Sequence, residues 1–446
     1  MKHVVIIGNG IAGITAARHI RKQSDHKITV ISGETEYFFS RTALMYVYMG
    51  HMKFEHTKPY EDRFWKKNRI DLIQAFVSKV DFINNKLICA SGDTVQYDDL
   101  ILAVGSKPNK FGWPGQELDG VQGLYSYQDL QLMEKNTTAH KVRNAVIVGG
   151  GLIGVEMAEM LMTRGIKVTF LIREARFWGN VLPEEEGKLV ERHIREHHVD
   201  LKFDTELSEI IGDKSGRAIA IKTNKGEQIS CEFIGLTAGV SPNVDFLKET
   251  ELEIDRGIVV NQYLETNMPN VYAIGDCAQN SNPAKGRRPI EQVWYTGRMM
   301  GETLARTICG EKTAYKPGIW FNSAKFFDIE YQTYGEVLSE LKEGQNQFYW
   351  EDSKGRIGYK MIFEKDTGKV IGVNVFGMRM RHEIWDSWLS SGKDANFVME
   401  HLRDANFDPE FYKKYEKDIV SEYNQQTGES VELKRKNWGR LLSKNY

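Results

Sequence analysis

A glycine-rich motif occurs twice in this 446-residue chain, each time directly after a short apolar run that is typical of a buried strand. In the first copy, the run 4–7 leads into a G-x-G-x-x-G motif at residues 8–13. In the second copy, the run 145–148 leads into the same spacing at residues 149–154. A helical pattern and a second strand pattern follow each motif: helices through about Lys22 and Arg164, strands at 27–31 and 167–172. Both copies predict the strand–helix–strand opening of a dinucleotide-binding domain.

Each of these two repeats also ends in a similar way, with an apolar segment that is followed by a glycine. Gly105 lies 97 positions after Gly8, and Gly239 lies 90 positions after Gly149. Two matched landmarks at similar spacing are much harder to obtain by chance than a single glycine motif. We therefore predict an α/β chain with two homologous, Rossmann-like dinucleotide-binding domains.

The spacing of the glycines suits the binding of a pyrophosphate. The first glycine allows a tight turn, the second lets the backbone approach the phosphates, and the third permits close packing of helix on strand. The helix N-terminus then points its free N–H groups at the anion. The alternative is a glycine-rich turn that binds no ligand, and the presence of two copies of the motif argues against it. The positions are Gly8, Gly10 and Gly13 in the first copy, and Gly149, Gly151 and Gly154 in the second.

The residues that follow the second strand of each copy predict different nucleotides. Glu34 lies 21 positions after Gly13, where a carboxylate binds the hydroxyls of an unphosphorylated ribose. The second copy has Arg173 and Arg176 in this region, and guanidinium groups pair with a 2′-phosphate. We predict FAD at the first site and NADPH in preference to NADH at the second. Glu174 weakens the second preference, and the alternative is that both arginines are merely solvated.

Beyond about Glu311 the pattern changes to alternating segments, which predict an antiparallel sheet followed by helices. This last unit is α+β and carries no glycine-rich loop. The segments are strands within 319–334, 347–349, 359–363 and 370–375, and helices near 382–390 and 394–402. The chain ends in a locally basic stretch that we interpret as a solvated tail, with Lys434, Arg435, Lys436, Arg440 and Lys444.

Composition excludes several other classes of protein. Lysine and arginine total 59 and aspartate and glutamate 61, so no overall positive charge points to nucleic acid or an anionic membrane. Lys2 and His3 before an apolar stretch could indicate a secretory leader, but interruption by Asn9 and three glycines favours strand, turn and helix. No uninterrupted apolar run reaches 18 residues, and four scattered cysteines form no disulfide framework. These features predict a cytoplasmic protein.

Four motifs in the same order resemble the FAD-dependent pyridine nucleotide–disulfide oxidoreductases. They are the glycines 8–13, Ala103-Val104-Gly105, the second motif ending in Gly154-Val155-Glu156, and the segment 272–278. The resemblance implies an NAD(P) domain inserted into the FAD domain, followed by a C-terminal interface domain that forms a homodimer. The expected boundaries are 1–113 with 244–310 for FAD, 114–243 for NAD(P), and 311–446 for the interface domain with its basic tail.

The resemblance also assigns roles to individual residues. Asp276 matches the aspartate at the FAD ribityl and pyrophosphate region, although a structural loop aspartate is the alternative. Glu156 matches the glutamate at the contact between nicotinamide and flavin, or is an ordinary surface glutamate. Arg41 matches a segment beside the isoalloxazine, and Val77 the place where backbone contacts the adenine. Ala12, inside the first glycine motif, is expected beside the cofactor.

Departures from the family pattern define the branch. No Cys-x-x-Cys or Cys-x4-Cys pair is present, and Ala43 stands where the coenzyme A disulfide reductases carry their active cysteine. Cys277 belongs to the FAD motif, and we predict a packed thiol there. The chain therefore resembles the cysteine-free rubredoxin and ferredoxin reductases and the flavin modules of nitrite reductases. Tyr46 replaces their lysine near the flavin, and Asn322 replaces an aromatic residue of their C-terminal domain.

Together these features predict an oxidoreductase that passes electrons from NAD(P)H through FAD directly to an external acceptor, with Glu156, Arg41 and Tyr46 at the reaction site. A small iron–sulfur or rubredoxin-type carrier is the expected acceptor, and a small molecule stays open. The alternatives are an NAD(P)H oxidase or a component of a larger complex, and a redox-sensing interaction protein like apoptosis-inducing factor.

No metal site is predicted. His193 shares a helical face with His197 and His198, but no third ligand is identifiable, so we interpret all three as solvated. Several aromatic residues of the last domain could line an acceptor surface, but core packing is the favoured interpretation. They are Trp320, Phe321, Phe326, Phe327 and Tyr331.

Overall fold

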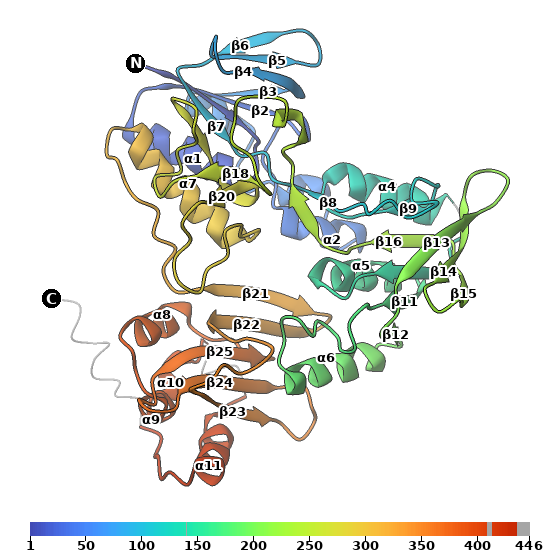
Figure 1. Ribbon diagram of the computed structural model, residues 1–446, viewed down its shortest axis with the longest axis vertical. Helices are drawn as coiled ribbons and strands as arrows, with labels where there is room; N and C mark the ends of the chain where they lie inside the picture. Colours follow the sequence, from blue (N-terminus) through green and yellow to red (C-terminus); the bar gives the residue numbers. More distant parts are fainter. Residues whose placement is uncertain (140, 408–412, 435–446) are drawn as a thin grey trace. The chain divides into compact units, whose positions relative to one another are not determined.

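The structure is a computed structural model that describes residues 1–139, 141–407 and 413–434. The chain divides into two compact units, each built from two separate stretches of sequence (Figure 1). The first unit comprises Met1–Leu171 and Thr205–Pro317, and the second comprises Ile172–Asp204 and Gly318–Tyr446.

A five-stranded parallel sheet forms the centre of the first unit, with the order β19-β7-β1-β2-β3. Its strands are short apolar runs, and Val4, Val5 and Ile6 in the middle strand are fully buried. The sequence predicted the first two strands and the helix between them to within two residues. The bounds are β1 His3–Ile7, β2 Lys27–Ser32, β3 Ile70–Gln74, β7 Asp99–Leu102 and β19 Val271–Ala273.

Two helices from opposite ends of this unit pack side by side, α1 (Ile11–Gln23) and α7 (Trp294–Ile308) (Figure 1). Their backbones approach closely, because a Cβ added at Gly301 would lie only 2.6 Å from the carbonyl oxygen of Ala12. The helix that contains position 300 therefore packs onto the strand–helix segment that begins at position 3.

A second parallel sheet in the same unit contains the second glycine motif, with the order β11-β10-β16-β9. Its strand β10 (Asn144–Val148) leads into α5 (Leu152–Met162) as β1 leads into α1. The remaining helix, α4 (Tyr127–Thr138), begins with a capping box between Ser126 and Asp129. The other strands are β9 Val121–Gln122, β11 Lys167–Leu171 and β16 Phe233–Leu236.

The two matching segments that close the repeats pair with each other. Strand β8 (Ser106–Pro108) runs antiparallel to β17 (Val240–Pro242), and this short ribbon joins the parts that carry the two sheets. Smaller sheets complete the unit: β4 Val77–Asp81 with β5 Lys86–Cys89 and β6 Thr94–Gln96, β13 Leu207–Gly212 with β14 Ala218–Thr223 and β15 Gln228–Ser230, and β18 Ile258–Val260 with β20 Ala278–Asn280. Short helices there are η1 Arg41–Ala43, α2 Leu44–Tyr48, η2 Phe54–Thr57, α3 Arg63–Lys67, η3 Asp245–Leu247 and η4 Gly275–Cys277.

The second unit is built on a five-stranded antiparallel sheet with the order β21-β22-β25-β24-β23, as the sequence predicted. The expected strand region 319–334 is two strands, because Phe327 takes a positive φ of 54° and turns the chain. The strands are β21 Phe321–Phe326, β22 Ile329–Gly335, β23 Gln345–Glu351, β24 Gly358–Glu364 and β25 Val370–Phe376. The helices are α6 Glu184–Glu196, α8 His382–Ser390, α9 Ala395–Glu400, α10 Leu402–Ala405 and α11 Glu416–Thr427, and β12 is Asp200–Lys202.

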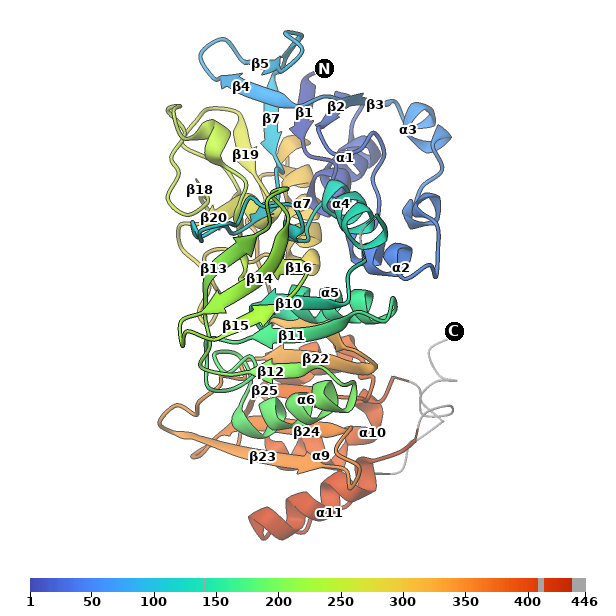
Figure 2. The same cartoon turned by 90° about the vertical axis from the view of Figure 1, so that its right-hand side faces the viewer.

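Helices cover both faces of this sheet, α6 on one face and α8 with α9 on the other (Figures 1 and 2). Alternation along β24 explains the arrangement. Tyr359 and Met361 enter the same apolar core as Trp385 of α8, whereas Lys360 between them pairs with Glu185 of α6 at 2.9 Å. Phe326, Phe327 and Tyr331 are buried, which confirms core packing for those three aromatic residues.

Among the described residues, no helix is long and apolar enough to cross a membrane. Of the basic tail, only Lys434 falls within the described residues, where its ammonium group pairs with Glu400 at 3.0 Å. Arg435, Lys436, Arg440 and Lys444 lie outside the described residues.

Candidate dinucleotide-binding sites

The first glycine of each motif makes a turn that other residues resist. Gly8 has a φ of +109° and Gly149 a φ of +108°, both in the left-handed region. A Cβ at Gly8 would lie 2.1 Å from the carbonyl oxygen of Ala103, and one at Gly149 would lie 2.9 Å from that of Thr237. The two turns therefore have the same conformation and the same close neighbour, a residue in the loop after an adjacent strand.

The second glycine of each motif is different, because it faces open space. Among the described residues, and apart from the adjoining backbone, no heavy atom lies within 4 Å of a Cβ built on Gly10 or Gly151. Each of these residues is the N-cap of the following helix, and no side chain of the described residues caps either helix. The first N–H groups of α1 and α5 are thus free to bind an anion, and the positive end of the helix dipole favours it. The residues present fit a pyrophosphate at both motifs.

The third glycine and its neighbours fix the helix against the sheet. A Cβ at Gly13 would lie 2.1 Å from the carbonyl oxygen of Gly8, and one at Gly154 would lie 2.7 Å from that of Gly149. Ala12 packs against η4, since a Cβ at Gly275 would come within 2.9 Å of its side chain. The first motif and the Gly275–Cys277 turn are therefore packed together, although they are more than 260 positions apart.

The predicted ribose-binding acid Glu34 is held by Arg41. The guanidinium donates to both carboxylate oxygens, at 2.9 and 2.6 Å, in the bidentate geometry of the strongest ion pairs. Arg41 also donates to the carbonyl oxygen of Tyr125 at 2.6 Å, and the backbone N–H of Tyr127 donates to Glu34 at 2.8 Å. Sequence reasoning did not predict this pairing, because the resemblance placed Arg41 beside the isoalloxazine.

Asp276 lies in η4, within a polar cluster of the first unit. Ser106 and Tyr125 donate to its carboxylate, at 3.3 and 3.4 Å. Burial raises the pKa of Asp276, while the charge of Arg41 acts in the opposite direction. Gly105, which closes the first repeat, approaches the same cluster, because a Cβ there would lie 2.8 Å from the hydroxyl of Tyr125. Sequence reasoning missed Tyr125, which no motif marks.

Glu156 and Tyr46 lie on α5 and α2, two short helices that pack together. Burial raises the pKa of Glu156 to about 7, and the nearby charge of Glu159 adds to the effect. The half-buried ring of Tyr46 stacks near His51, with centroids 6.1 Å apart. Glu156 therefore changes its proton occupancy near neutral pH, as the donors and acceptors of active sites often do.

An arginine that sequence reasoning did not select joins these helices. The Arg164 guanidinium lies 3.7 Å from the centre of the Tyr48 ring and donates to the Tyr48 carbonyl oxygen at 3.1 Å. It also pairs with Glu134 of α4 at 2.7 Å. Because the three residues are far apart in the sequence, no local signal could have predicted the cluster.

The remaining predicted residues occupy separate places. Val77 is the buried first residue of β4, and Gly239 has a φ of +90° where its carbonyl oxygen accepts from the backbone N–H of Asn109. Arg173 and Arg176 follow β11 in the chain and belong to the second unit. Arg173 is 70% exposed and pairs with Glu174 at 3.0 Å, whereas Arg176 donates to a backbone oxygen at 3.3 Å.

The four cysteines offer no thiol relay. All four lie in the described part of the chain, and all are free. Cys277 is fully buried, burial raises its pKa to about 12, and its thiol donates to the carbonyl oxygens of Leu102 and Ile274. A thiol with so high a pKa is a poor nucleophile. The prediction of a packed Cys277 is therefore confirmed.

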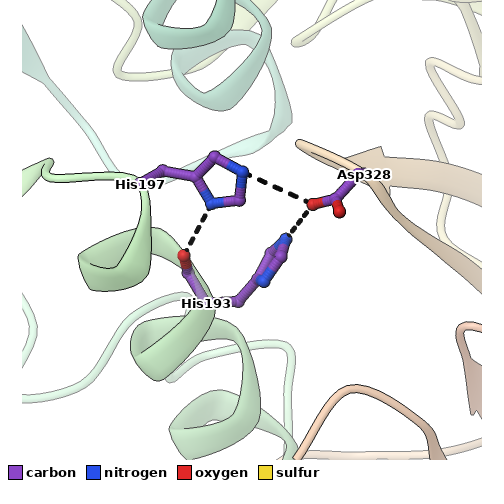
Figure 3. Close-up of side chains that lie close together, drawn as sticks. All are labelled: His193, His197 and Asp328. Carbon is purple, nitrogen blue, oxygen red and sulfur yellow. Dashed lines mark hydrogen bonds and ion pairs between the residues drawn. The ribbon is translucent and has the colours of Figure 1, made fainter.

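The interpretation of the histidines as solvated was wrong for His193, whose side chain is only 1% exposed. Its ring lies 2.5 Å from Asp328, which also lies 3.5 Å from the half-buried His197, whereas His198 is exposed as expected (Figure 3). Asp328 was missed because it comes from the turn between β21 and β22, 131 positions after His197. The fold of the second unit brings the three groups together.

Two matching nucleotide cradles in one unit, with no accessible thiol pair, indicate a flavin-linked oxidoreductase. The family described as pyridine nucleotide-disulphide oxidoreductase matches residues 2–301, and the chain belongs to this family. It is an oxidoreductase of the FAD- and NAD(P)H-dependent kind that this family implies.

Individual relatives of this chain are named as NADH oxidases and NAD(P)-linked reductases. The chain is 28% identical over 394 residues to an NADH oxidase of Methanocaldococcus jannaschii, covering 84% of this chain and 87% of the relative. It is 29% identical over 321 residues to a rubredoxin-NAD(+) reductase of Acinetobacter baylyi, covering 70% and 80%. Its fold is similar to that of an NAD-dependent persulfide reductase from A. fulgidus, with a TM-score of 0.82 and 24% identity over 96% of this chain and 84% of that chain.

Proposed function

We propose that this protein takes electrons from NAD(P)H, passes them through FAD, and delivers them directly to an external carrier protein of the rubredoxin or ferredoxin type. The observation that carries the proposal is the pair of open cradles at uncapped helix N-termini in the first unit. Two such sites in one chain fit a donor nucleotide and a flavin nucleotide, and a single nucleotide would need only one.

The first motif is the proposed FAD site. The N-terminus of α1 holds the pyrophosphate, Glu34 accepts from the ribose hydroxyls, and Asp276 accepts from the ribityl chain. FAD, when bound, accepts two electrons from the nucleotide and releases them one at a time. Arg41 orients Glu34 through its two hydrogen bonds, and it brings a positive charge to the polar cluster that contains Asp276.

The second motif is the proposed NAD(P)H site. The N-terminus of α5 holds its pyrophosphate, and Glu156, one turn further along the same helix, is placed toward the nicotinamide end. A carboxylic acid with a pKa of about 7 carries its proton in about half of the molecules at neutral pH. We propose that Glu156 hydrogen-bonds the carboxamide or a nearby polar group and so positions the nicotinamide.

NADPH is the proposed physiological donor, because Arg173 and Arg176 follow the second strand of the second motif in the sequence and guanidinium groups pair with a 2′-phosphate. Arg173 is partly neutralised by Glu174, whereas the charge of Arg176 acts on the nearby Glu184 carboxylate and its guanidinium donates to a backbone oxygen at 3.3 Å. A phosphate offers a charge-assisted bond that is stronger than this contact.

A carrier protein is favoured as acceptor because the rubredoxin-NAD(+) reductase relative, which matches 70% of this chain, acts by its name on such a carrier. Oxygen is the second candidate, favoured by the NADH oxidase relative, to which the chain is similar over 84% of its length. The homodimer, and the division into domains at 1–113 with 244–310, 114–243 and 311–446, stay predictions.

The test begins with the purified flavin-loaded protein under anaerobic conditions. NADPH and NADH are added in turn, and the bleaching of the oxidised flavin spectrum is followed by stopped-flow absorbance. Rubredoxin, a ferredoxin and air-saturated buffer are then offered separately as acceptors, with peroxide measured alongside. Bleaching followed by rapid carrier reduction supports the proposal, rapid oxygen consumption supports the oxidase, and a spectrum that neither nucleotide changes refutes both.

A further inference from the structure

Three metal-ligating side chains meet in the second unit, away from both nucleotide motifs in the sequence (Figure 3). They are His193 in the last turn of α6, His197 just after it, and Asp328 in the turn between β21 and β22. One nitrogen or oxygen of each lies within 4.8 Å of the others. All three residues belong to the same compact unit, so the cluster is part of one body.

The two imidazoles present their Nε2 atoms to the same carboxylate oxygen. Nε2 of His193 lies 2.5 Å from Oδ1 of Asp328, and Nε2 of His197 lies 3.5 Å from the same atom. His193 is 1% exposed, and neither of its ring nitrogens has an aligned hydrogen-bond partner among the described residues. A buried imidazole needs a polar partner, and here the Asp328 carboxylate, or a cation bound between the two groups, can supply it.

The second ring nitrogen of His197 is held in the way that a metal-binding histidine requires. Nδ1 of His197 lies 2.9 Å from the carbonyl oxygen of His193, and its N–H donates there, which leaves Nε2 with a lone pair directed at Asp328. On His193, Nδ1 lies 3.8 Å from the carboxylate of Glu196 and is not fixed by an aligned hydrogen bond among the described residues, so this ring is free to present its lone pair at Nε2. Two imidazole lone pairs and a carboxylate that face one another favour the binding of a cation between them.

We propose that His193, His197 and Asp328 bind a divalent transition-metal ion, with Zn²⁺ the best fit. Zinc takes two imidazoles and a carboxylate at about 2.0–2.2 Å, so its ligand atoms lie about 3.3 Å apart in a tetrahedral site. The 3.5 Å separation already matches, and the 2.5 Å one must open by less than about 1 Å. Magnesium and calcium prefer all-oxygen sites and fit poorly.

The fourth position of the metal is filled by water. Asp328 is 62% exposed, which leaves the cluster open to solvent on its side, while Phe327 stacks on His197 with 4.6 Å between ring centroids and closes the other. The metal would tie the end of α6 to the β21–β22 turn across two stretches of chain. This site is independent of the proposed electron transfer and would remain if that proposal failed.

The experiment uses the full-length, flavin-loaded protein without a histidine tag, freed of metal by chelation and dialysis. Zn²⁺, Co²⁺ and Mg²⁺ are titrated by calorimetry, and the visible ligand-field bands of Co²⁺ are read as a difference spectrum against the metal-free protein. The variants are Asp328→Asn, His197→Gln and, as matched control, His198→Asn. His198 is exposed, adjacent to the cluster and at a φ of 61° that asparagine tolerates.

The expected result is one Zn²⁺ per chain, with tetrahedral Co²⁺ bands, an increase in Tm, and no comparable binding of Mg²⁺. Asp328→Asn and His197→Gln each weaken Zn²⁺ binding by about tenfold or more and abolish the Co²⁺ bands, while His198→Asn changes the affinity by less than about twofold. Because Asp328 is on the surface, its variant keeps the fold, which the circular dichroism spectrum checks. Absence of saturable Zn²⁺ binding, or equal weakening by the control, would overturn the proposal.

Discussion

Replacing the second glycine of either motif by alanine would separate the two nucleotide sites. Gly10 has a φ of −68° and Gly151 a φ of −91°, conformations that alanine adopts without strain, and the space around both Cβ positions is open. Gly10→Ala and Gly151→Ala should therefore fold normally. Without bound nucleotide they should be slightly more stable, by about 0.4–1 kcal/mol, because alanine restricts the unfolded chain.

The same methyl group occupies the space that a pyrophosphate needs. Displacing the phosphates from the helix N-terminus weakens one charge-assisted hydrogen bond, which is worth roughly 1.5–3 kcal/mol. The corresponding loss of affinity is about 10- to 150-fold. Gly10→Ala should lower the flavin content of the purified protein. Gly151→Ala should retain the flavin and instead weaken the binding of NAD(P)H.

Flavin absorbance per protein and anaerobic nucleotide titrations measure the two effects, and unfolding of the flavin-free proteins in urea measures stability. Gly8→Ala serves as a contrast, because its positive φ and the 2.1 Å approach to Ala103 should destabilise the fold by about 2–5 kcal/mol. If Gly151→Ala lost flavin while keeping nucleotide affinity, the assignment of the two sites would be reversed. If Gly10→Ala bound flavin normally, the cradle argument itself would be wrong.

Three further predictions concern single residues. Arg176→Ala should reduce kcat/KM for NADPH by about tenfold while leaving NADH within about twofold, and equal losses in steady-state assays would argue against a 2′-phosphate contact. Burial raises the pKa of Glu156 to about 7, so the protonated side chain contributes fully to folding stability below about pH 4.5, and this contribution is lost as the pH rises to about 7. The free energy of unfolding should therefore fall by roughly 2–3 kcal/mol over this range because of Glu156, and Glu156→Gln should remove that part of the fall. Urea unfolding at several pH values measures the difference. Under native conditions a thiol reagent should modify only the partly exposed Cys309 and spare activity, so inhibition on modification of Cys277 would revive a thiol relay.

Local sequence predicted what local physics controls. The strand, turn and helix of each repeat follow from apolar runs and glycines within 20 residues, and Gly8 and Gly149 have the predicted turn conformation. The antiparallel sheet of the last domain was predicted from alternation, but its first hairpin was not resolved. The turn at Phe327 and Asp328 contains no glycine, and a single aspartate was too weak a turn signal to divide the alternating segment.

Long-range contacts were beyond this reasoning. Arg41 and Glu34 lie only seven positions apart in the sequence, yet their pairing depends on the Tyr125 loop that lies beside them. The burial of His193 depends on the β21–β22 turn, which covers the end of α6. A helical face rich in charge looks solvated in sequence, and only the element packed against it decides otherwise.

The order of strands and glycines along the chain determined that this protein has two nucleotide-binding motifs, because a tight turn and an open helix N-terminus are encoded within a few adjacent residues. Tertiary structure alone decided which distant side chains share a site: Tyr125 with Asp276, Arg164 with Tyr48, and Asp328 with two histidines. The physical reason is that such contacts join elements separated by up to about 150 positions, and their geometry is fixed by sheet order and helix packing rather than by any residue pattern.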